Sequence, residues 1–505
     1  MNTKHSYSFE TIESFPEIPQ LSIPDYSHLN ASFRKALLDP RNGAYTKNKE
    51  NGHPNFGAYL MSNSNEMVTW GILAVGEKLC ARETDWIAIT YKDFFDYELN
   101  LFLNSPGIRK IEYWYLFYSN TLAGAVQRSL YENDADSIRL MGLAADTMHK
   151  LAQKVDYDFN NQGYDFFEDS VFTKLDIYRQ PDSVAGYAYN MLFAALRAQR
   201  PQYYSESIKA IKYYEEFEHN PWYEIPNGSA GLLASAWLNA HGEETNVYKS
   251  AAWLFDHSEG PLQIGKWGDE EINGLMMGWR GDTRKDAMNS AYSMESLMPV
   301  QFILPAVRYC PQLADNTARY MLNVLSNFQL FYAHGTKSLY ETKAELDPAV
   351  PYERLERELD GHTPAACGDF HGHRSVYGAG YLCWMQALAL KTNDPHIFAY
   401  DLSLTDWLAE KIYPVYLLRN PHEDIRHVTF DIAEVWKQIR PTLFEEKPVY
   451  WDMEKLSSID ENVIAVKEKE SRIIAVLPKG ITPQINNGII CADGAELCVN
   501  IGGEQ

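Results

Sequence analysis

The sequence predicts an all-α fold, an (α/α)6 toroid of alternating inner and outer helices, with an extended N-terminal arm and a small C-terminal antiparallel β appendage. Apolar residues recur at spacings of three and four from about residue 65 to 420, which indicates helices. These helices are of two kinds that alternate along the chain. One kind is rich in Ala, Gly and apolar residues on every side and must be buried, whereas the other is amphipathic. Such alternation is typical of a double ring of helices.

Three regions follow from the pattern. Residues 1–60 carry five prolines among polar residues, so we expect an extended arm. Residues 61–445 form the predicted catalytic barrel. After Pro441 the sequence changes to β-branched runs broken by Asn and Gly, which predicts a small β-rich appendage over 446–505.

Twelve helices are expected in the barrel, six of each kind. The expected inner helices span 65–80, 112–130, 182–199, 227–240, 286–307 and 374–390. The expected outer helices span residues near 84–103, 134–154, 203–218, 245–257, 312–332 and 396–412.

Charge and length exclude several classes of protein. The 505 residues include 45 Lys and Arg against 68 Asp and Glu, a net charge of −23, which disfavours nucleic acid and anionic membrane as partners. No apolar run approaches the roughly 20 residues that span a bilayer. The six cysteines are scattered without a CxxC pair, so we expect a reduced, cytoplasmic protein, or a secreted one if a leader has been removed. We predict a small-molecule substrate as partner and leave a homo-oligomer open.

Candidate chemistry lies at the N-terminal ends of the inner helices, where free N–H groups and a partial positive charge face a pocket. The sixth end, Gly-Asp-Phe-His-Gly-His-Arg, is the densest in acid–base groups. Our candidate catalytic residues are Asp182, Asp286, Tyr292, Asp369, His371, His373 and Tyr377. Our candidate substrate-binding residues are Trp114, Tyr187, Trp222, Glu224, Asn227, Trp279, Arg280, Asn289 and Arg374. The alternative for Asp182, Asp286 and Asn227 is a plain helix N-cap.

No metal and no cofactor are predicted. His371-x-His373 with Asp369 could ligate a metal, but all three ligands lie on one loop and no distant partner is evident. The run from Gly260 to Lys266 imitates a phosphate-binding loop, but Trp267 stands where Ser or Thr would hold magnesium.

Isolated patches resemble the linalool dehydratase/isomerase-like family. The patches are Arg109-Lys-Ile-Glu-Tyr113, Tyr115-Leu-Phe-Tyr118, His219-Asn-Pro-Trp222, Ile225-Pro-Asn-Gly228, Asn239-Ala-His241-Gly242 and Asn289-Ser-Ala-Tyr292. The resemblance implies an (α/α)6 barrel and cofactor-free acid–base chemistry on a terpenoid alcohol. Two features depart from the family: the stretch from Tyr223 to Ser235 lacks its cysteine pair, and Tyr187 stands in place of a histidine.

The leading prediction is a cofactor-free acid–base lyase or isomerase. Its substrate would be hydroxylated, largely apolar and terpenoid-like, and the reaction would be a dehydration, a double-bond shift or a cyclisation. Tyr and Trp rings at the helix ends would stabilise a developing carbocation. The alternative is a carbohydrate-active (α/α)6 enzyme, either a glycoside hydrolase or a polysaccharide lyase, acting on an oligosaccharide with or without uronate. The third hypothesis is a non-catalytic helical scaffold. A polar, wet pocket would favour sugar, and a closed, dry aromatic chamber would favour a terpenoid.

Overall fold

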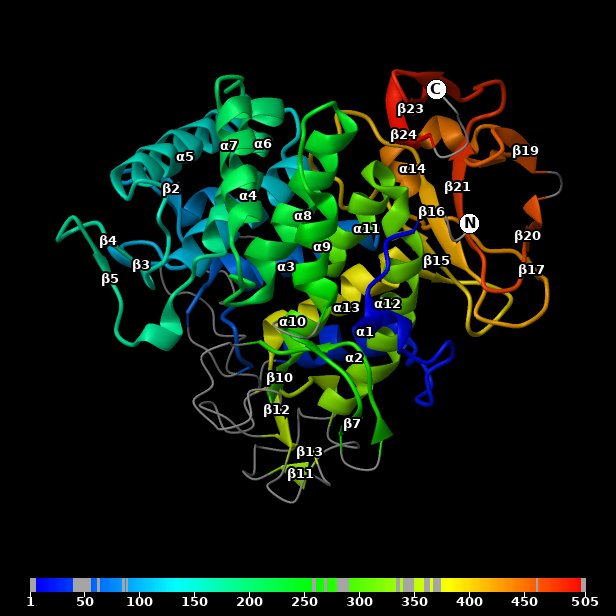
Figure 1. The fold of residues 1–505 in the computed structure, drawn as a ribbon, viewed down its shortest axis with the longest axis horizontal. Coiled ribbons are helices and arrows are strands. Elements are labelled where there is room, and N and C mark those ends of the chain that lie inside the picture. The colour runs from blue at the N-terminus through cyan, green and yellow to red at the C-terminus, as the bar shows by residue number, and fades with distance from the viewer. Residues whose placement is uncertain are drawn as a thin grey trace.

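The computed structural model describes residues 6–39, 56–60, 64–83, 87, 90–256, 260–267, 270–278, 290–332, 337–338, 349–357, 364–366, 374–459 and 462–500. Within these residues the chain is rich in helix and ends in antiparallel sheets, as predicted (Figure 1). No helix in this part of the chain is both long and apolar enough to cross a bilayer.

A closed ring of inner helices forms the centre of the molecule. It consists of α3 (Met67–Leu79), α4 (Tyr113–Leu130), α6 (Ser183–Arg197), α8 (Ile225–Ala240), α10 (Ser293–Leu297) with α11 (Val300–Tyr309), and α13 (Val376–Leu388). Each packs against the next in this order, and α13 closes the ring against α3. The six expected inner segments are therefore confirmed as helices, although the fifth begins only at Ser293 in the described residues.

Five outer helices cover this ring within the described residues: α2 (Tyr26–Leu37), α5 (Ala135–Lys154), α7 (Tyr203–Glu216), α9 (Val247–Phe255) and α12 (Ala314–Asn327). The outer helix α2 packs on α13, so the N-terminal segment that we expected to be wholly extended supplies part of the outer layer. It begins where Asp25 accepts hydrogen bonds from the backbone N–H groups of Ser27 and His28. A shorter helix, α1 (Glu10–Glu13), precedes it.

The expected outer helices at 84–103 and 396–412 are wrong. The first segment contains the 3₁₀ turn η2 (Tyr91–Phe94) and a hairpin of β1 (Phe95–Asp96) and β2 (Leu101–Phe102), and the second contains strand β15 (Phe398–Asp401). In both places an aspartate side chain accepts hydrogen bonds from backbone N–H groups that would otherwise bond to backbone carbonyls of a helix. Asp96 accepts from Glu98 and Leu99, and Asp401 accepts from Ser403 and Leu404. Such local side-chain bonds compete with a helix.

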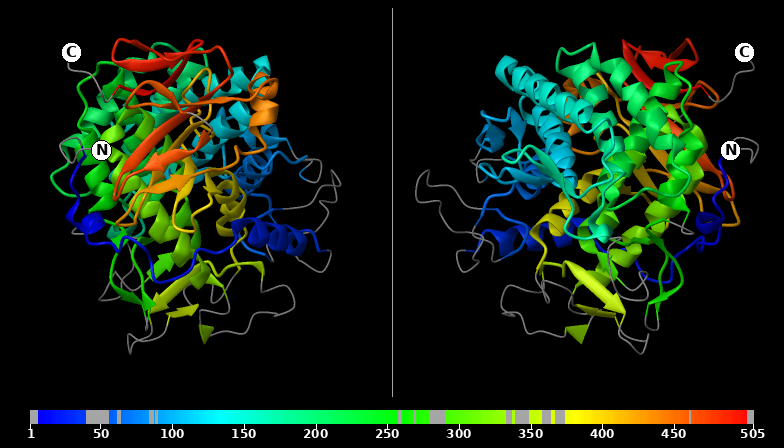
Figure 2. Two further views of the ribbon diagram at one scale, coloured as in Figure 1. Left: turned by 90° about the vertical axis from the view of Figure 1, so that its right-hand side faces the viewer. Right: turned by 60° about the vertical axis from the view of Figure 1, so that its left-hand side comes forward.

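The strands of the C-terminal sheets begin at Ala389, before the start of the expected appendage. Six form one antiparallel sheet in the order β14 (Ala389–Lys391), β15, β16 (Val415–Arg419), β21 (Ser471–Leu477), β18 (Val449–Asp452), β19 (Ser457–Ile459). Beside it lie the pair β17 (Arg426–Val428) and β20 (Ile464–Val466), the short helix α14 (Trp436–Ile439), and the sheet β22 (Gln484–Asn486), β23 (Ile489–Ala492), β24 (Ala495–Val499). The six-stranded sheet packs on α12 through β16 and β21, along one side of the helical ring (Figure 2).

Short strands surround the helix ends. One sheet consists of β3 (Lys110–Glu112), β4 (Gly163–Asp165) and β5 (Ser170–Phe172); another of β10 (Ser290–Tyr292), β12 (Arg354–Arg357), β13 (Pro364–Ala366) and β11 (Lys337–Ser338). Two strand pairs complete the set, β6 (Leu262–Gln263) with β9 (Leu275–Met276) and β7 (Lys266–Trp267) with β8 (Glu270–Glu271). Because β3 leads directly into α4 and β10 into α10, these strands position the N-terminal ends of inner helices.

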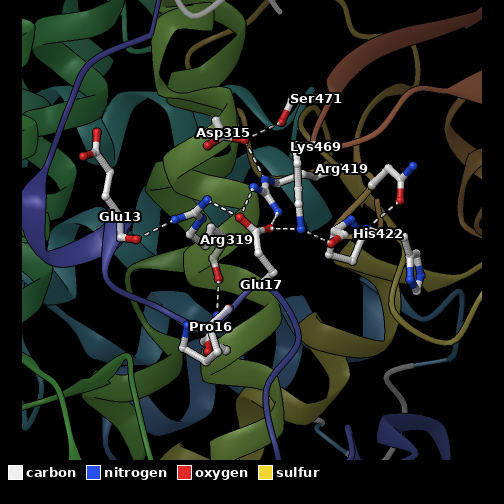
Figure 3. Close-up of polar contacts among 12 residues, drawn as sticks. Glu13, Pro16, Glu17, Asp315, Arg319, Arg419, His422, Lys469 and Ser471 are labelled. Carbon is white, nitrogen blue, oxygen red and sulfur yellow. Dashed lines mark hydrogen bonds and ion pairs between the residues drawn. The ribbon is translucent and has the colours of Figure 1, made fainter. Parts of the chain in front are cut away.

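Polar contacts fasten the N-terminal segment to the rest of the molecule (Figure 3). Arg319 on α12 donates to the backbone carbonyl of Glu13 at 2.9 Å. Arg419 at the end of β16 bonds to Glu17 and to Asp315 on α12. The segment, the outer helix and the sheet therefore meet in one charged network.

Candidate functional site

The N-terminal ends of the inner helices converge, and most begin with a carboxyl group. The residues at these ends are Glu66 on α3, Glu112 on α4, Asp182 on α6, Glu224 on α8, Tyr292 on α10 and Ser375 on α13. Glu224 interacts electrostatically with Glu112, Asp182, Glu295 and Glu353, so these ends lie close together in space. Helix N-termini favour negative charge because their free N–H groups carry partial positive charge.

Three of these groups, Glu224, Glu295 and Glu353, form what we call the carboxyl cluster. Glu295 lies in α10, and Glu353 immediately precedes β12; both are buried. Burial raises the pKa of Glu224 and of Glu295 well above the ordinary value, and the charges of neighbouring carboxylates raise both further. Among the described residues no Lys or Arg forms an ion pair with the cluster. Buried carboxyl groups without a cation stay neutral more readily than they ionise.

Within the cluster, Glu353 is the group best able to lose its proton. Burial raises its pKa from 4.5 to about 7, whereas hydrogen bonds from Ser375, Tyr377 and Ser293 act in the opposite direction. The Ser293 hydroxyl lies 3.3 Å from Glu353 Oε2. In contrast, burial and the charge of Glu353 raise the pKa of Glu295 well above the ordinary value, which favours its protonated form. The environment therefore separates an ionisable carboxyl group from a proton-holding one.

Four tyrosines, which we call the mouth tyrosines, surround the cluster: Tyr59, Tyr115, Tyr292 and Tyr377. The hydroxyls of Tyr59 and Tyr377 lie 3.4 Å apart. Burial raises the pKa of Tyr115, as do the nearby Glu66 and Glu224, yet 39% of its surface remains accessible.

Beneath the cluster the ring is also polar. Gln301 on α11 donates through Nε2 to Tyr118 of α4 at 2.9 Å and to Tyr381 of α13 at 3.1 Å, and the two phenol oxygens are hydrogen-bonded to each other. Both tyrosines interact electrostatically with Glu295. Carboxyl, phenol and amide groups thus continue from the helix ends into the ring.

Four of the predicted site residues lie at the converging ends: Asp182, Glu224, Tyr292 and Tyr377. Asp182 is buried and precedes α6 as predicted. Trp114 is buried beside Tyr115, with ring centroids 4.6 Å apart in an edge-to-face arrangement.

The structure places other predicted residues away from the cluster. Tyr187 points outward from α6 toward outer helices, where its hydroxyl lies 3.0 Å from His149 Nδ1 and 3.4 Å from Glu206. Asn227 joins α8 to α6 by donating to the Ser183 hydroxyl at 3.3 Å. Both residues join neighbouring helices in these contacts.

Arg374 and Trp222 are also buried in the framework. The guanidinium of Arg374 lies 3.6 Å from the ring centre of Tyr352, and it donates to the backbone carbonyl of Val350. The backbone N–H of Trp222 donates to Asn220. Seven predicted residues lie outside the described residues: Trp279, Arg280, Asp286, Asn289, Asp369, His371 and His373.

The candidate lists omitted Glu295, Glu353, Tyr59 and Tyr115. Glu295 carried a signal, since it is the one charged residue in the mostly apolar segment Ala291–Val307. A charge in a buried helix costs free energy unless it has a function or a partner. Glu353 carried none, because it lies in an irregular segment and only the fold brings it beside α10.

No family model and no curated protein matches this chain, so neither comparison finds the linalool dehydratase/isomerase resemblance. Solved structures do resemble it. A sugar epimerase from a ruminal bacterium is similar at 10% identity and a TM-score of 0.45, over 71% of this chain and 98% of that one. An unsaturated glucuronyl hydrolase mutant from Streptococcus agalactiae is similar at 12% identity and a TM-score of 0.43, over 76% and 96%. The cellobiose 2-epimerase from Spirochaeta thermophila is similar at 9% identity and a TM-score of 0.42, over 71% and 96%.

The leading expectation, a terpenoid lyase or isomerase, is therefore corrected. The solved structures named above are, by their names, enzymes that act on sugars. The helix ends themselves present carboxyl and phenol groups rather than the dry aromatic chamber that we expected for a terpenoid.

Proposed function

We propose that this protein is a carbohydrate-active enzyme that hydrolyses a glycosidic bond in a neutral sugar. The observation that carries the proposal is the carboxyl cluster, in which Glu224, Glu295 and Glu353 are buried together and form no ion pair with a Lys or Arg of the described residues. Hydrolysis of a glycoside needs one carboxylic acid and one carboxylate on either side of the scissile bond. We propose that the fold of this enzyme is an (α/α)6 toroid, in which the closed ring of inner helices is the inner layer.

The different environments suggest the roles. Glu295, whose pKa is raised by burial and by the charge of Glu353, keeps its proton and acts as the general acid on the leaving oxygen. Glu353, with hydroxyl donors from three residues, ionises first and acts as the carboxylate that activates water or attacks the sugar. Glu224 interacts electrostatically with both, and their charges raise its own pKa, so it too keeps its proton. The mouth tyrosines supply ring faces for a sugar and hydroxyls for its oxygens.

Neutral sugars fit this site better than uronates. A substrate carboxylate would add negative charge to a cluster that already resists ionisation, and no described Lys or Arg forms an ion pair with that cluster. Sugar hydroxyls, in contrast, both donate to carboxylates and accept from carboxylic acids.

The test is hydrolysis of a panel of neutral aryl glycosides and oligosaccharides by wild type and by three variants. Glu295→Gln and Glu353→Gln should each lower kcat by about 100- to 10,000-fold, the range typical of a lost acid or base. Glu215→Gln is the matched control, because burial also raises the pKa of Glu215, but this residue lies on the outer helix α7. It should keep wild-type activity.

The pH profile supplies a second readout. Because the pKa of Glu353 is about 7, kcat/KM should rise as pH increases through this value, where the carboxylate forms. Turnover of uronates in place of neutral glycosides would contradict the substrate class. Full activity of both Glu295→Gln and Glu353→Gln would contradict the mechanism.

A further inference from the structure

A second group of chemically active side chains lies on the C-terminal sheet. Asp394 and His396 belong to the turn between β14 and β15, and His422 follows β16. One ligand atom from each residue lies within 4.8 Å of the other two. Strands β14, β15 and β16 are neighbours, so the sheet brings together side chains that are 28 residues apart in the sequence.

The geometry suits a transition metal. His422 Nε2 lies 3.1 Å from Asp394 Oδ1, and the two imidazole rings have centroids 5.6 Å apart. Zinc bonds of about 2.0–2.1 Å place tetrahedral ligand atoms roughly 3.3 Å apart, so small side-chain rotations close the remaining separation. Two imidazoles and one carboxylate, with a further position for water, are a recurrent ligand set for zinc.

Hydrogen bonds hold two of the ligands in place. The backbone N–H of His396 donates to Asp394 Oδ1 at 2.9 Å, which fixes the turn. Asn420 accepts from the backbone N–H of His422 at 2.9 Å and donates to the carbonyls of Val466 and Lys467, both at 3.0 Å. Figure 3 shows His422 on this loop near Lys469, whose amine donates to the carbonyl of Pro421 at 2.6 Å.

The site is reachable from solvent and lies beside a guanidinium group. Asp394 and His396 line a cavity of about 560 Å³ together with N-terminal residues from Pro19 to Pro24. Arg426 lies 3.5 Å from Asp394 Oδ2, so a dication competes with this guanidinium for one carboxylate oxygen. Asp394 Oδ1, which accepts from the backbone N–H of His396, faces His422 and lies away from this guanidinium.

We propose that Asp394, His396 and His422 bind a divalent transition metal of the zinc class, which fastens the β14–β15 turn to the loop after β16. The imidazoles bind in their neutral form through one ring nitrogen each, and Asp394 binds as a carboxylate. The open coordination position holds water. This site is independent of the proposed glycoside hydrolysis, because its ligands lie outside the converging helix ends.

The test is a calorimetric titration of chelator-treated protein with Zn²⁺ alone. His396→Ala and His422→Ala should each remove one bound ion per chain or weaken its affinity. Loss of a residue that only supports a ligand weakens metal affinity by roughly 10- to 100-fold, and we expect a larger effect than this for the loss of a ligand. His427→Ala is the matched control, since His427 is exposed on the adjacent strand β17 and should leave binding unchanged. A wild type that binds no Zn²⁺, or unchanged binding in both ligand variants, would overturn the proposal.

A variant that is expected to bind Zn²⁺ more tightly distinguishes loss of a ligand from a folding defect. Arg426→Gln removes the competing cation, so it should tighten Zn²⁺ binding while the metal-free thermal transition stays close to that of wild type. With Co²⁺ in place of Zn²⁺, wild type and Arg426→Gln should show the visible absorption of a tetrahedral site, and His422→Ala should not. Unchanged or weaker binding in Arg426→Gln would mean that the three side chains form only a structural hydrogen-bonded network.

Discussion

The burial of Glu353 couples its proton to folding. Its pKa rises from 4.5 to about 7 because protein surrounds it, although Ser293, Ser375 and Tyr377 donate hydrogen bonds to it. The folded state therefore binds this proton more tightly than the unfolded chain does. The resulting stabilisation is complete below pH 4.5 and is lost as pH rises through 7.

We expect Glu353→Gln to flatten the pH dependence of stability. Between pH 4.5 and 7 the wild type should lose roughly 3 kcal/mol of unfolding free energy through Glu353, since one pKa unit corresponds to about 1.4 kcal/mol. An amide cannot titrate, so the variant should lack this loss. Denaturant unfolding of both proteins at pH 4.5 and at pH 7.5 measures the difference. Parallel curves would mean that the Glu353 proton is not linked to folding.

At the scale of the elements, close helix contacts explain the glycines and alanines of the buried helices. A Cβ built on Gly231 of α8 would lie 2.6 Å from the Cβ of Ala185 on α6, so these two helices approach almost to backbone contact. In contrast, a Cβ on Gly71 of α3 would lie 3.5 Å from its nearest neighbour, Leu122, which is an ordinary packing distance.

These two positions make a matched pair. Gly231→Ala should lower the unfolding free energy by about 1–3 kcal/mol, because a rigid Cβ cannot move away and the helices must separate. Gly71→Ala should be neutral or raise stability by up to about 1 kcal/mol, since Ala favours the helix. Urea unfolding of both variants tests the pair. Equal effects would contradict the close approach of α6 and α8.

Two elements also show where a helical pattern in the sequence predicts the wrong secondary structure. The segments 84–103 and 396–412 have apolar spacing that suits a helix, yet Asp96 and Asp401 bond to backbone N–H groups two and three residues ahead and end the strands in turns. Periodicity alone does not distinguish these alternatives, because a short apolar run fits a buried strand as well.

At the scale of the whole molecule, Arg308 joins the helical ring to the C-terminal hairpin. On α11 it forms a fully buried ion pair with Asp406, and it donates to the backbone carbonyls of Leu497 and Glu496 at the last strand. Arg308→Met would leave Asp406 buried without its cation.

We expect Arg308→Met to cost about 3–5 kcal/mol of unfolding free energy, as is usual when one partner of a buried pair is removed. Arg308→Met with Asp406→Asn should recover part of the loss, because no charge then remains uncompensated. Thermal and denaturant unfolding of the single and double variants measure this coupling. A single variant that unfolds within about 1 kcal/mol of wild type would contradict it.

The sequence by itself determined the inner helices and the side of the ring where chemistry gathers. Helices that are apolar all round have no alternative to burial, and Asp182, Glu224, Tyr292 and Tyr377 stand at their N-termini by local spacing alone. Only the tertiary structure decided the rest. It brings Glu353 from an irregular segment beside Glu295, and it joins Asp394 and His396 to His422 across neighbouring strands. The reason is physical: helix formation depends on residues three and four apart, whereas the proton affinity of a carboxyl group depends on which distant charges and donors the closed ring encloses with it.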